Sequence, residues 1–148
     1  MSSPELLPYE TTLLVRDSCL CLHVQRAARA LARRFDEVLR PFALTNGQFS
    51  LLMSLNRPEP PPMGPVATLL AMDRTTLTAA LKPLERRGLV EVSPDAADRR
   101  SRILKLTREG RKLLARALPT WQKTHEELER LMPEGASDQL RKNLNALC

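Results

Sequence analysis

Residues 72–88 are Met72-Asp-Arg-Thr-Thr-Leu-Thr-Ala-Ala-Leu-Lys-Pro-Leu-Glu-Arg-Arg-Gly88, and this stretch decides the fold. Asp73 is a preferred helix N-cap residue and Gly88 a preferred terminator, so the sequence between them predicts a helix. At about 100° per residue, Leu77, Leu81 and Leu84 fall in one narrow sector. The helix is therefore expected to pack through this side and to leave the other side exposed.

The exposed side of this helix carries short hydroxyl groups and cations. Such groups suit a helix lying in the major groove of DNA, because Thr reaches phosphates, bases or the thymine methyl group and Lys neutralises phosphate. Pro83 removes the hydrogen bond to the carbonyl of Ala79, which predicts a kinked or loosened helix there. The candidate DNA contacts on this helix are Arg74, Thr75, Thr76, Thr78, Lys82 and Arg86.

A β-hairpin with a basic tip is predicted directly after the helix. Residues 89–92 form its first strand, residues 93–98 the turn and residues 99–106 the returning strand. Its basic residues are Arg99, Arg100 and Arg102. Beside a reading helix, such a hairpin meets the flanking backbone or an adjacent minor groove, whose negative potential favours arginine. We expect Asp98 to orient one guanidinium through a bidentate bond. The alternative is an edge hairpin that charge protects from aggregation.

The charge distribution supports a polyanionic partner. Residues 74–112 hold 11 of the 23 Lys and Arg residues but only 5 of the 17 Asp and Glu residues, so this segment carries the whole net charge of +6. Basic and acidic residues cancel in the rest of the chain. A contiguous basic surface is what binding to duplex DNA requires. The alternative is a solvated basic surface without a ligand.

Helical periodicity dominates the flanking segments. One long amphipathic helix is predicted over residues 10–40, ended by Pro41, and a second, capped by Thr45, runs to Leu55. The proline-rich residues 57–65 form a loop, and a short helix follows from Pro65. A further helix starts at Thr107, and the last spans residues 137–147. The terminal helices, residues 10–40 and 107–148, have more apolar surface than a small lobe of residues 42–106 covers, which predicts a homodimer.

Length and composition predict a single domain over residues 1–148, with a mainly α fold and a small β-hairpin. The sequence contains no apolar run long enough to span a membrane and no signal-peptide pattern, so we expect a cytoplasmic protein without a membrane partner. Three cysteines at irregular spacing suggest reduced thiols. No cofactor or metal site is predicted.

Five segments in this order resemble the MarR family of bacterial transcriptional regulators. They are residues 42–52, 72–78, 84–90, 98–102 and 106–111. The resemblance implies a winged helix-turn-helix fold with N- and C-terminal dimerisation helices. It also implies a homodimer that binds a pseudo-palindromic DNA operator, usually as a repressor, and that small aromatic ligands or thiol oxidation release. Two positions depart from the family pattern: members often carry Arg where this chain has Ala79 and Ala97, which leaves open which bases are read.

The candidate switch residues lie on the first predicted helix and are Cys19, Cys21, His23, Arg16 and Arg26. The basic groups could anchor a carboxylate or phenolate effector. Cys21 lies near the reactive cysteine of the peroxide-sensing branch of the family, so a thiol-based redox switch is an alternative. A thiol enzyme using Cys19 or Cys21 with His23 is a rival from another class, but the sequence offers no oxyanion setting for it. Cys19 and His23, four residues apart, would supply only half of a metal site.

Overall fold

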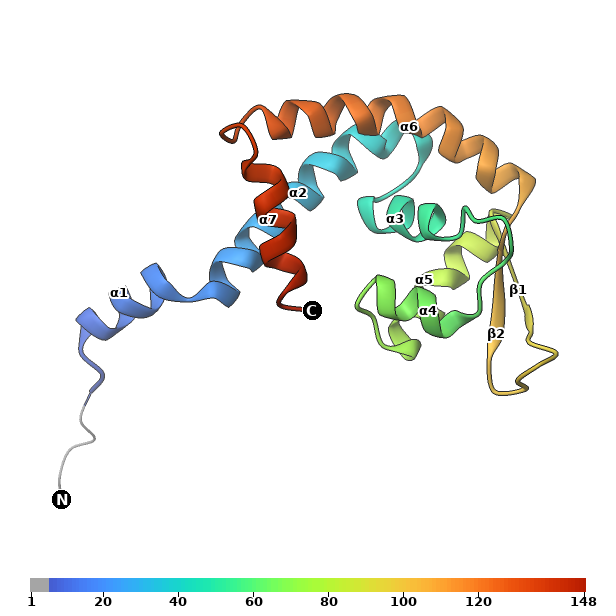
Figure 1. The fold of residues 1–148 in the computed structure, drawn as a ribbon, viewed down its shortest axis with the longest axis horizontal. Helices are drawn as coiled ribbons and strands as arrows, with labels where there is room; N and C mark the ends of the chain where they lie inside the picture. Colours follow the sequence, from blue (N-terminus) through green and yellow to red (C-terminus); the bar gives the residue numbers. More distant parts are fainter. Residues whose placement is uncertain (1–5) are drawn as a thin grey trace, which may run out of the picture. The chain divides into compact units, whose positions relative to one another are not determined.

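The computed structural model describes residues 6–148, which are mostly helical with one antiparallel pair of strands (Figure 1). The predicted fold class, helices with a small β-hairpin, is confirmed. The chain divides into two compact units, residues up to Arg34 and residues 35–148. The elements are α1 (Tyr9–Ser18), α2 (Leu20–Leu39), the 3₁₀ helix η1 (Arg40–Phe42), α3 (Asn46–Ser54), α4 (Met63–Leu69), α5 (Arg74–Arg86), β1 (Val90–Pro94), β2 (Arg102–Leu106), α6 (Arg108–Glu129) and α7 (Ala136–Asn145).

The single helix predicted over residues 10–40 is wrong, because α1 ends at Ser18 and α2 begins at Leu20. Cys19 between them has an extended backbone, with φ −69° and ψ 110°. The hydroxyl of Ser18 donates to the carbonyl of Leu14 at 2.5 Å, a local bond of the kind that bends helices. No side chain of α1 is buried, so no packing holds the two segments in one straight helix.

The start of α3 follows the prediction closely. Thr45 is its N-cap: the Thr45 hydroxyl accepts from the backbone N–H of Gln48 at 3.2 Å, and the Gln48 side chain accepts from the Thr45 N–H at 3.0 Å. Asp36 fixes the same corner, since its carboxylate accepts from the backbone and the side-chain amide of Asn46 at 2.7 and 2.8 Å. These two bonds, the backbone one first, lower the pKa of Asp36 below its ordinary value.

The hydrophobic core of the second unit draws on every element from the end of α2 to the middle of α6. Its fully buried side chains include Leu39, Leu51, Leu52, Leu55, Val66, Leu77, Leu84, Val90, Leu104 and Leu106. The predicted inner face of α5 is confirmed, because Leu77, Leu81 and Leu84 are each at most 2% exposed. Helix α5 continues through Pro83 without interruption. This packing sets the rotation of α5 and hence the direction of its outer face.

The proline-rich segment covers an edge of the hairpin. The carbonyl of Pro61 accepts from the backbone N–H of Leu104 at 2.9 Å, and Pro62 pairs with Ile103. Prolines lack a backbone donor, so this pairing occupies the edge of β2 without extending the sheet further. Helix α4 begins at Met63, two residues before the Pro65 start that the sequence predicts.

The hairpin pairs β1 with β2 in antiparallel register, from Val90 opposite Leu106 to Pro94 opposite Arg102. It lies beside α4 and α5 in Figure 1. The returning strand is shorter than predicted, because Arg99 and Arg100 belong to the turn. Thr107, where the sequence predicts the start of a helix, is the N-cap of α6 and accepts from the N–H of Gly110 at 3.0 Å. None of the helices described for residues 6–148 is long and apolar enough to cross a bilayer.

Candidate nucleic-acid interface

The outer face of α5 is fixed at both ends of the helix. The Asp73 carboxylate accepts from the backbone N–H of Thr76 at 2.7 Å and so caps the helix. This bond lowers the pKa of Asp73, which keeps the cap ionised. At the other end, the guanidinium of Arg87 donates to the carbonyl of Ala43 at 2.6 Å. The polar side chains between these ends are exposed to solvent.

A groove of about 360 Å³ lies between α5 and the hairpin. Five of the nine candidate DNA contacts line it. Arg74, Thr78 and Lys82 come from α5, and Arg100 and Arg102 come from the hairpin. The structure therefore brings together cations that are up to 28 residues apart in the sequence. A groove bordered by four cations is suited to a phosphate-bearing backbone.

The other four candidates lie outside this groove and are exposed: Thr75, Thr76, Arg86 and Arg99. Thr78 has a structural bond of its own, because its hydroxyl donates to the carbonyl of Arg74 at 2.7 Å. A hydroxyl engaged in this way still offers its oxygen lone pairs and its methyl group. Thr75 has no such bond among the described residues, so its hydroxyl is available for an outward contact.

The expected role of Asp98 is wrong. Its carboxylate accepts from the backbone N–H of Arg100 at 3.0 Å, and its carbonyl accepts from the N–H of Ser101 at 2.9 Å. Among the described residues it makes no bond to a guanidinium. Asp98 thus shapes the turn that carries the arginines, because short acidic side chains bond their own backbone two residues on.

Sequence reasoning did not assign four members of the groove to the site. Met63, Leu81, Glu85 and Val92 line it together with the predicted residues. Glu85 places a negative charge beside the basic residues and so limits which groups enter that end of the groove. Its position three residues after Lys82 on the same helix is the signal that could have identified it. Met63 comes from another element, and only the fold brings it there.

Comparison with known proteins identifies the family that has this arrangement of helices and hairpin. A family model described as "MarR family" matches residues 44–101, which contain α3 to the tip of the hairpin. The transcriptional regulator HosA of Escherichia coli O157:H7 is 39% identical over 94 residues, which cover 62% of this chain and 68% of HosA. The chain belongs to the MarR family. It spans about half the length of two further curated regulators, 54% and 50%.

Two solved MarR-like structures are similar over most of the chain. The transcriptional regulator MosR of Mycobacterium tuberculosis, solved in complex with DNA, has a TM-score of 0.79 and 35% identity, and covers 88% of this chain and 93% of MosR. The repressor CouR of Rhodococcus jostii, bound to a 23-mer DNA duplex, has a TM-score of 0.77 and 33% identity, with 90% and 94% covered. Winged helix-turn-helix is therefore the fold of this MarR-family chain.

The two departures from the MarR pattern both lie on exposed positions. Ala79 is on the outer face of α5, three residues before Lys82. Ala97 is in the hairpin turn, where its N–H donates to the Asp95 carboxylate at 2.9 Å. Neither methyl group offers a hydrogen bond to a base or a phosphate. The neighbouring exposed cations and threonines do offer such hydrogen bonds.

The thiols and the imidazole of the first unit are not arranged as a reactive pair. The Nδ1 atom of His23 lies 2.7 Å from the carbonyl oxygen of Cys19, so the ring bonds the backbone of that residue. The Cys19 sulfur accepts from the N–H of Leu22 at 3.4 Å. The exposed Cys21 sulfur accepts from the side-chain amide of Gln25 at 2.9 Å. Thiol catalysis requires a base in hydrogen-bond contact with the nucleophile. His23 makes no such contact with the sulfur of Cys19 or of Cys21.

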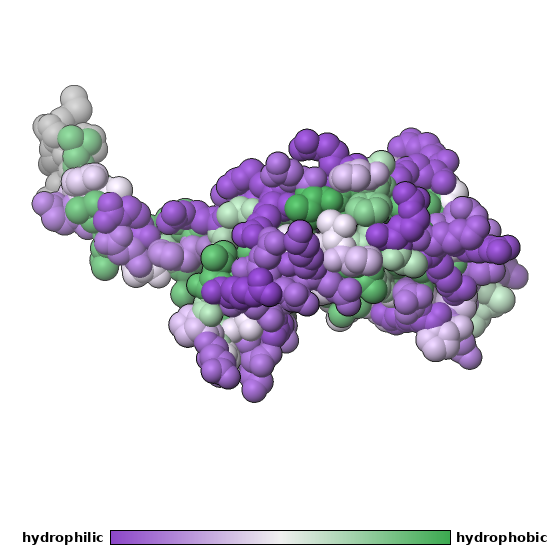
Figure 2. Space-filling view, turned by 90° about the horizontal axis from the view of Figure 1, so that it is seen from above, coloured by the Kyte–Doolittle hydropathy of each residue, from purple (hydrophilic) through white to green (hydrophobic). Residues whose placement is uncertain are grey.

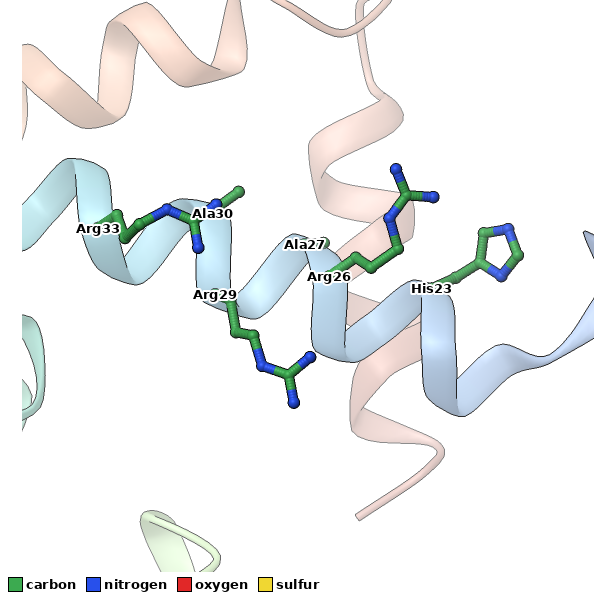
Figure 3. Close-up of a pocket in the computed structure, with 6 residues that line it drawn as sticks. All are labelled: His23, Arg26, Ala27, Arg29, Ala30 and Arg33. Atoms are coloured by element: carbon green, nitrogen blue, oxygen red, sulfur yellow. The ribbon is translucent and has the colours of Figure 1, made fainter. Parts of the chain in front are cut away.

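The three basic effector candidates separate into two places. Arg16 forms an ion pair with the neighbouring Asp17, with Nε 2.7 Å from the carboxylate. His23 and Arg26 line a shallow hollow of about 500 Å³ on α2, together with Arg29 and Arg33 (Figure 3). Sequence reasoning did not include Arg29 and Arg33. Their spacing was a readable signal, because Arg29 follows Arg26 by three residues and Arg33 follows Arg29 by four.

Proposed function

We propose that this chain is a transcriptional repressor that binds a pseudo-palindromic DNA operator as a homodimer and is released by a small aromatic or carboxylate ligand. The observation that carries the proposal is the groove between α5 and the hairpin, where Arg74 and Lys82 face Arg100 and Arg102. Two relatives of similar structure, MosR and CouR, were solved with DNA. A bacterial transcriptional regulator works in the cytoplasm, where its DNA lies. The proposal gives this chain no catalytic role.

The α5 side and the hairpin side of the groove are suited to different contacts with DNA. Helix α5 offers Thr75 and Lys82 outward from a rigid, buried leucine face, which suits insertion into the major groove. The hairpin offers Arg100 and Arg102 to the neighbouring phosphates or to a minor groove. Every phosphate contact adds affinity by releasing counterions, without regard to sequence. Specificity then rests on the α5 side chains that reach base edges.

A mobility-shift titration tests the DNA contact. The probe is a promoter fragment selected by the purified protein from genomic DNA, and the salt concentration is varied. Lys82→Ala and Arg100→Ala should each weaken binding and reduce the slope of log K against log salt by about one unit. Lys123→Ala and Arg130→Ala, which change exposed cations of α6 outside the groove, are the matched controls. Binding that does not depend on salt, or equal losses in the controls, would overturn the proposal.

The homodimer is supported by apolar surface that the single chain leaves open. Leu14, Val15 and Leu20 in the first unit are 54–69% exposed, and Leu140 and Leu147 near the C-terminus are 45% and 63% exposed. Figure 2 shows hydrophobic residues lying open to solvent along the N-terminal helices. Groups of exposed apolar side chains such as these are typical of a protein–protein interface. A two-fold dimer places two reading helices about 34 Å apart, one turn of DNA.

Light scattering after size-exclusion chromatography tests the dimer. We expect twice the mass of the 16.7 kDa chain at micromolar concentration. Leu20→Glu puts a charge on the exposed apolar face and should shift the species towards the monomer and weaken operator binding. Arg16→Glu on α1, whose residue already lies at a solvated ion pair, is the control. A monomeric parent protein that still binds its operator tightly would exclude the dimer model.

The small-ligand part of the proposal is supported by an aromatic cavity of about 150 Å³ in the second unit. Phe49, Trp121 and His125 stack in series on its wall, with ring centroids 6.0 Å and 4.8 Å apart. A cavity of this order accommodates one benzene-sized ring. Asn46 and Ser50 supply polar groups at its border that can hold a carboxylate or phenolate.

The single tryptophan of the chain is therefore a built-in reporter of ligand binding. Benzoate, salicylate and 4-hydroxybenzoate should quench or shift Trp121 fluorescence and raise the melting temperature, and a ligand that does so should release the operator in a mobility shift. Aromatic acids and coenzyme A thioesters form the wider screen. A reporter gene placed behind the operator should be repressed by the protein and restored by the ligand. Activation of that reporter, or no hit in the whole screen, would contradict this part.

A further inference from the structure

The outer face of α2 carries an uncompensated row of basic side chains. Residues 18–35 contain four arginines and His23 but no Asp or Glu. Arg26 and Arg33 make no hydrogen bond or ion pair in the part of the chain that the structure describes, and Arg29 bonds only the neutral side chain of Gln25, at 3.2 Å. Arg26, Arg29 and Arg33 therefore have no acidic partner among the described residues.

Two exposed cations of α6 and α7, Lys112 and Arg141, have a different environment. There Lys112 lies 3.4 Å from Glu109, and Arg141 lies 2.5 Å from Asp138 and 3.1 Å from Glu129. Interspersed charges of both signs are usual on a helix face that only needs to be solvated. A row of arginines over about two helical turns, in a segment of about five turns without an acidic residue, by contrast attracts anions.

The row also has the shape of a site. Arg26, Arg29 and Arg33 line a shallow hollow of about 500 Å³, and Ala27 and Ala30 line it on one side of the arginine row. In Figure 3, His23 and Arg26 project to one side of the helix axis and Arg29 to the other, and the two alanines lie on the side of Arg26. Cations with methyl groups beside them suit a ligand that is both anionic and partly apolar.

This face stays accessible in the proposed dimer. At about 100° per residue, the exposed apolar residues of α2, Leu20, Val24 and Leu31, centre on a direction about 170° away from the centre of the three arginines. A partner that covers the apolar side of α2 therefore leaves the arginine side open. The arginine row and the interface do not compete for the same residues.

The geometry points to a binding site for an organic ligand with two or more phosphate groups, held by Arg26, Arg29 and Arg33 of α2. Along the helix axis, Arg26 and Arg29 are about 4.5 Å apart and Arg29 and Arg33 about 6 Å apart, so a single carboxylate or phosphate engages only part of the row. Guanidinium groups bind phosphate oxygens in pairs, and two linked phosphates use neighbouring arginines at once. The alanines beside the row accept the organic part. This site stands independently of the DNA-binding proposal.

Isothermal titration of the full chain with ADP at low salt tests this site, with adenosine and inorganic pyrophosphate as comparison probes. ADP should bind, adenosine should not, and pyrophosphate should bind more weakly than ADP. The double variant Arg26→Gln with Arg33→Gln should weaken ADP binding by about tenfold or more, since each charged hydrogen bond is worth at least about that factor. Arg130→Gln, a solvated arginine of α6, should change it by less than about twofold.

The outcomes separate this site from the DNA proposal. Circular dichroism first verifies that the double variant keeps its helices, and its operator affinity should equal that of the parent protein. Equal ADP affinity in parent and double variant, or no ADP binding to the parent, would overturn the site. Loss of operator affinity in the double variant with no ADP binding would assign the row to DNA contact instead. A protein that binds ADP through these arginines but binds no DNA would contradict only the proposed function.

Discussion

Two regions of the chain, the winged lobe and the terminal helices, differ in how they are stabilised. Among residues 6–148, the buried hydrophobic residues all lie between Leu39 and Ala117, in the winged lobe and its junction with α6. Neither α1 nor α7 buries a single side chain, and the only buried residue of α2 is Leu39 at its very end. The lobe thus contains its own core, whereas these terminal helices carry exposed apolar residues. Stability of the lobe should be intrinsic, and that of the ends should depend on association.

The strongest test of this difference replaces one leucine in each region. Leu77→Ala removes a side chain that is 0% exposed on the inner face of α5, and should cost about 2–5 kcal/mol of unfolding free energy because it leaves a cavity. Leu14→Ala in α1, where the side chain is 64% exposed, should cost less than about 0.5 kcal/mol at a concentration where the protein is monomeric. Urea denaturation monitored by circular dichroism measures both. Similar costs at high dilution would show that the ends have a core of their own.

A second test concerns the close approach of Gly110, at the start of α6, to the backbone of Leu89. A Cβ atom added at Gly110 would lie 2.4 Å from the carbonyl oxygen of Leu89 and 2.6 Å from a methyl group of Leu106. Gly110→Ala therefore forces the start of α6 away from the hairpin, and we expect a loss of about 1–3 kcal/mol. Gly47→Ala in α3, where the nearest atom to the added Cβ is 4.0 Å away, is the control and should be neutral or slightly stabilising. Thermal unfolding compares the two, and an unaffected Gly110→Ala protein would contradict the tight junction.

The sequence predicted the elements whose boundaries are set by local chemistry. Thr45 and Asp73 were identified as caps and Thr107 as the start of a helix. All three cap a helix, because the bond from a short side chain to the backbone three residues on depends on neighbours alone. The break at Cys19 was missed, because the apolar periodicity continues through it. The periodicity reports which residues would share a face, but only buried contacts force them into one straight helix.

The candidate site was predictable in its members but not in its arrangement. The cations of α5 and of the hairpin follow from pattern and charge. Their meeting in one groove depends on the packing of β1 against α5, and so does the presence of Met63 and Glu85 in it. Asp98 was assigned to a guanidinium, but the nearer backbone N–H of Arg100 satisfies it. Arg29 and Arg33 of α2 were overlooked because charge was counted over long segments, where distant acidic residues cancel their positive charge.

A third test asks whether the lobe extends into α6. The Thr107 hydroxyl donates to the carbonyl of Gly88 at 2.7 Å and accepts from the N–H of Gly110 at 3.0 Å, so it links the end of α5 to the start of α6. Thr107→Ala should cost about 1 kcal/mol, as loss of an N-cap usually does. Thr107→Ser keeps both bonds and should restore most of this stability. If the alanine variant unfolds like the parent protein, then α6 is not part of the cooperative unit of the lobe.

The smallest expected effect is a dependence of lobe stability on pH. The bond from the Thr76 N–H lowers the pKa of Asp73 in the folded protein below its ordinary value of 3.8. A carboxyl group with a lowered folded pKa contributes stability that is fully present above the unfolded value, and this stability is lost as the pH falls through the folded pKa. Stability from Asp73 is therefore constant near pH 7 and decreases in the acid range below about pH 4. Asp73→Asn should flatten this part of the pH profile, whereas Asp17→Asn in α1 should leave it unchanged, because Asp17 lies in the unit without a core. Melting temperatures between pH 3 and pH 7 measure the difference. A profile that Asp17→Asn flattens as much as Asp73→Asn would mean that the ends and the lobe unfold as one unit, and the distinction between them would fail.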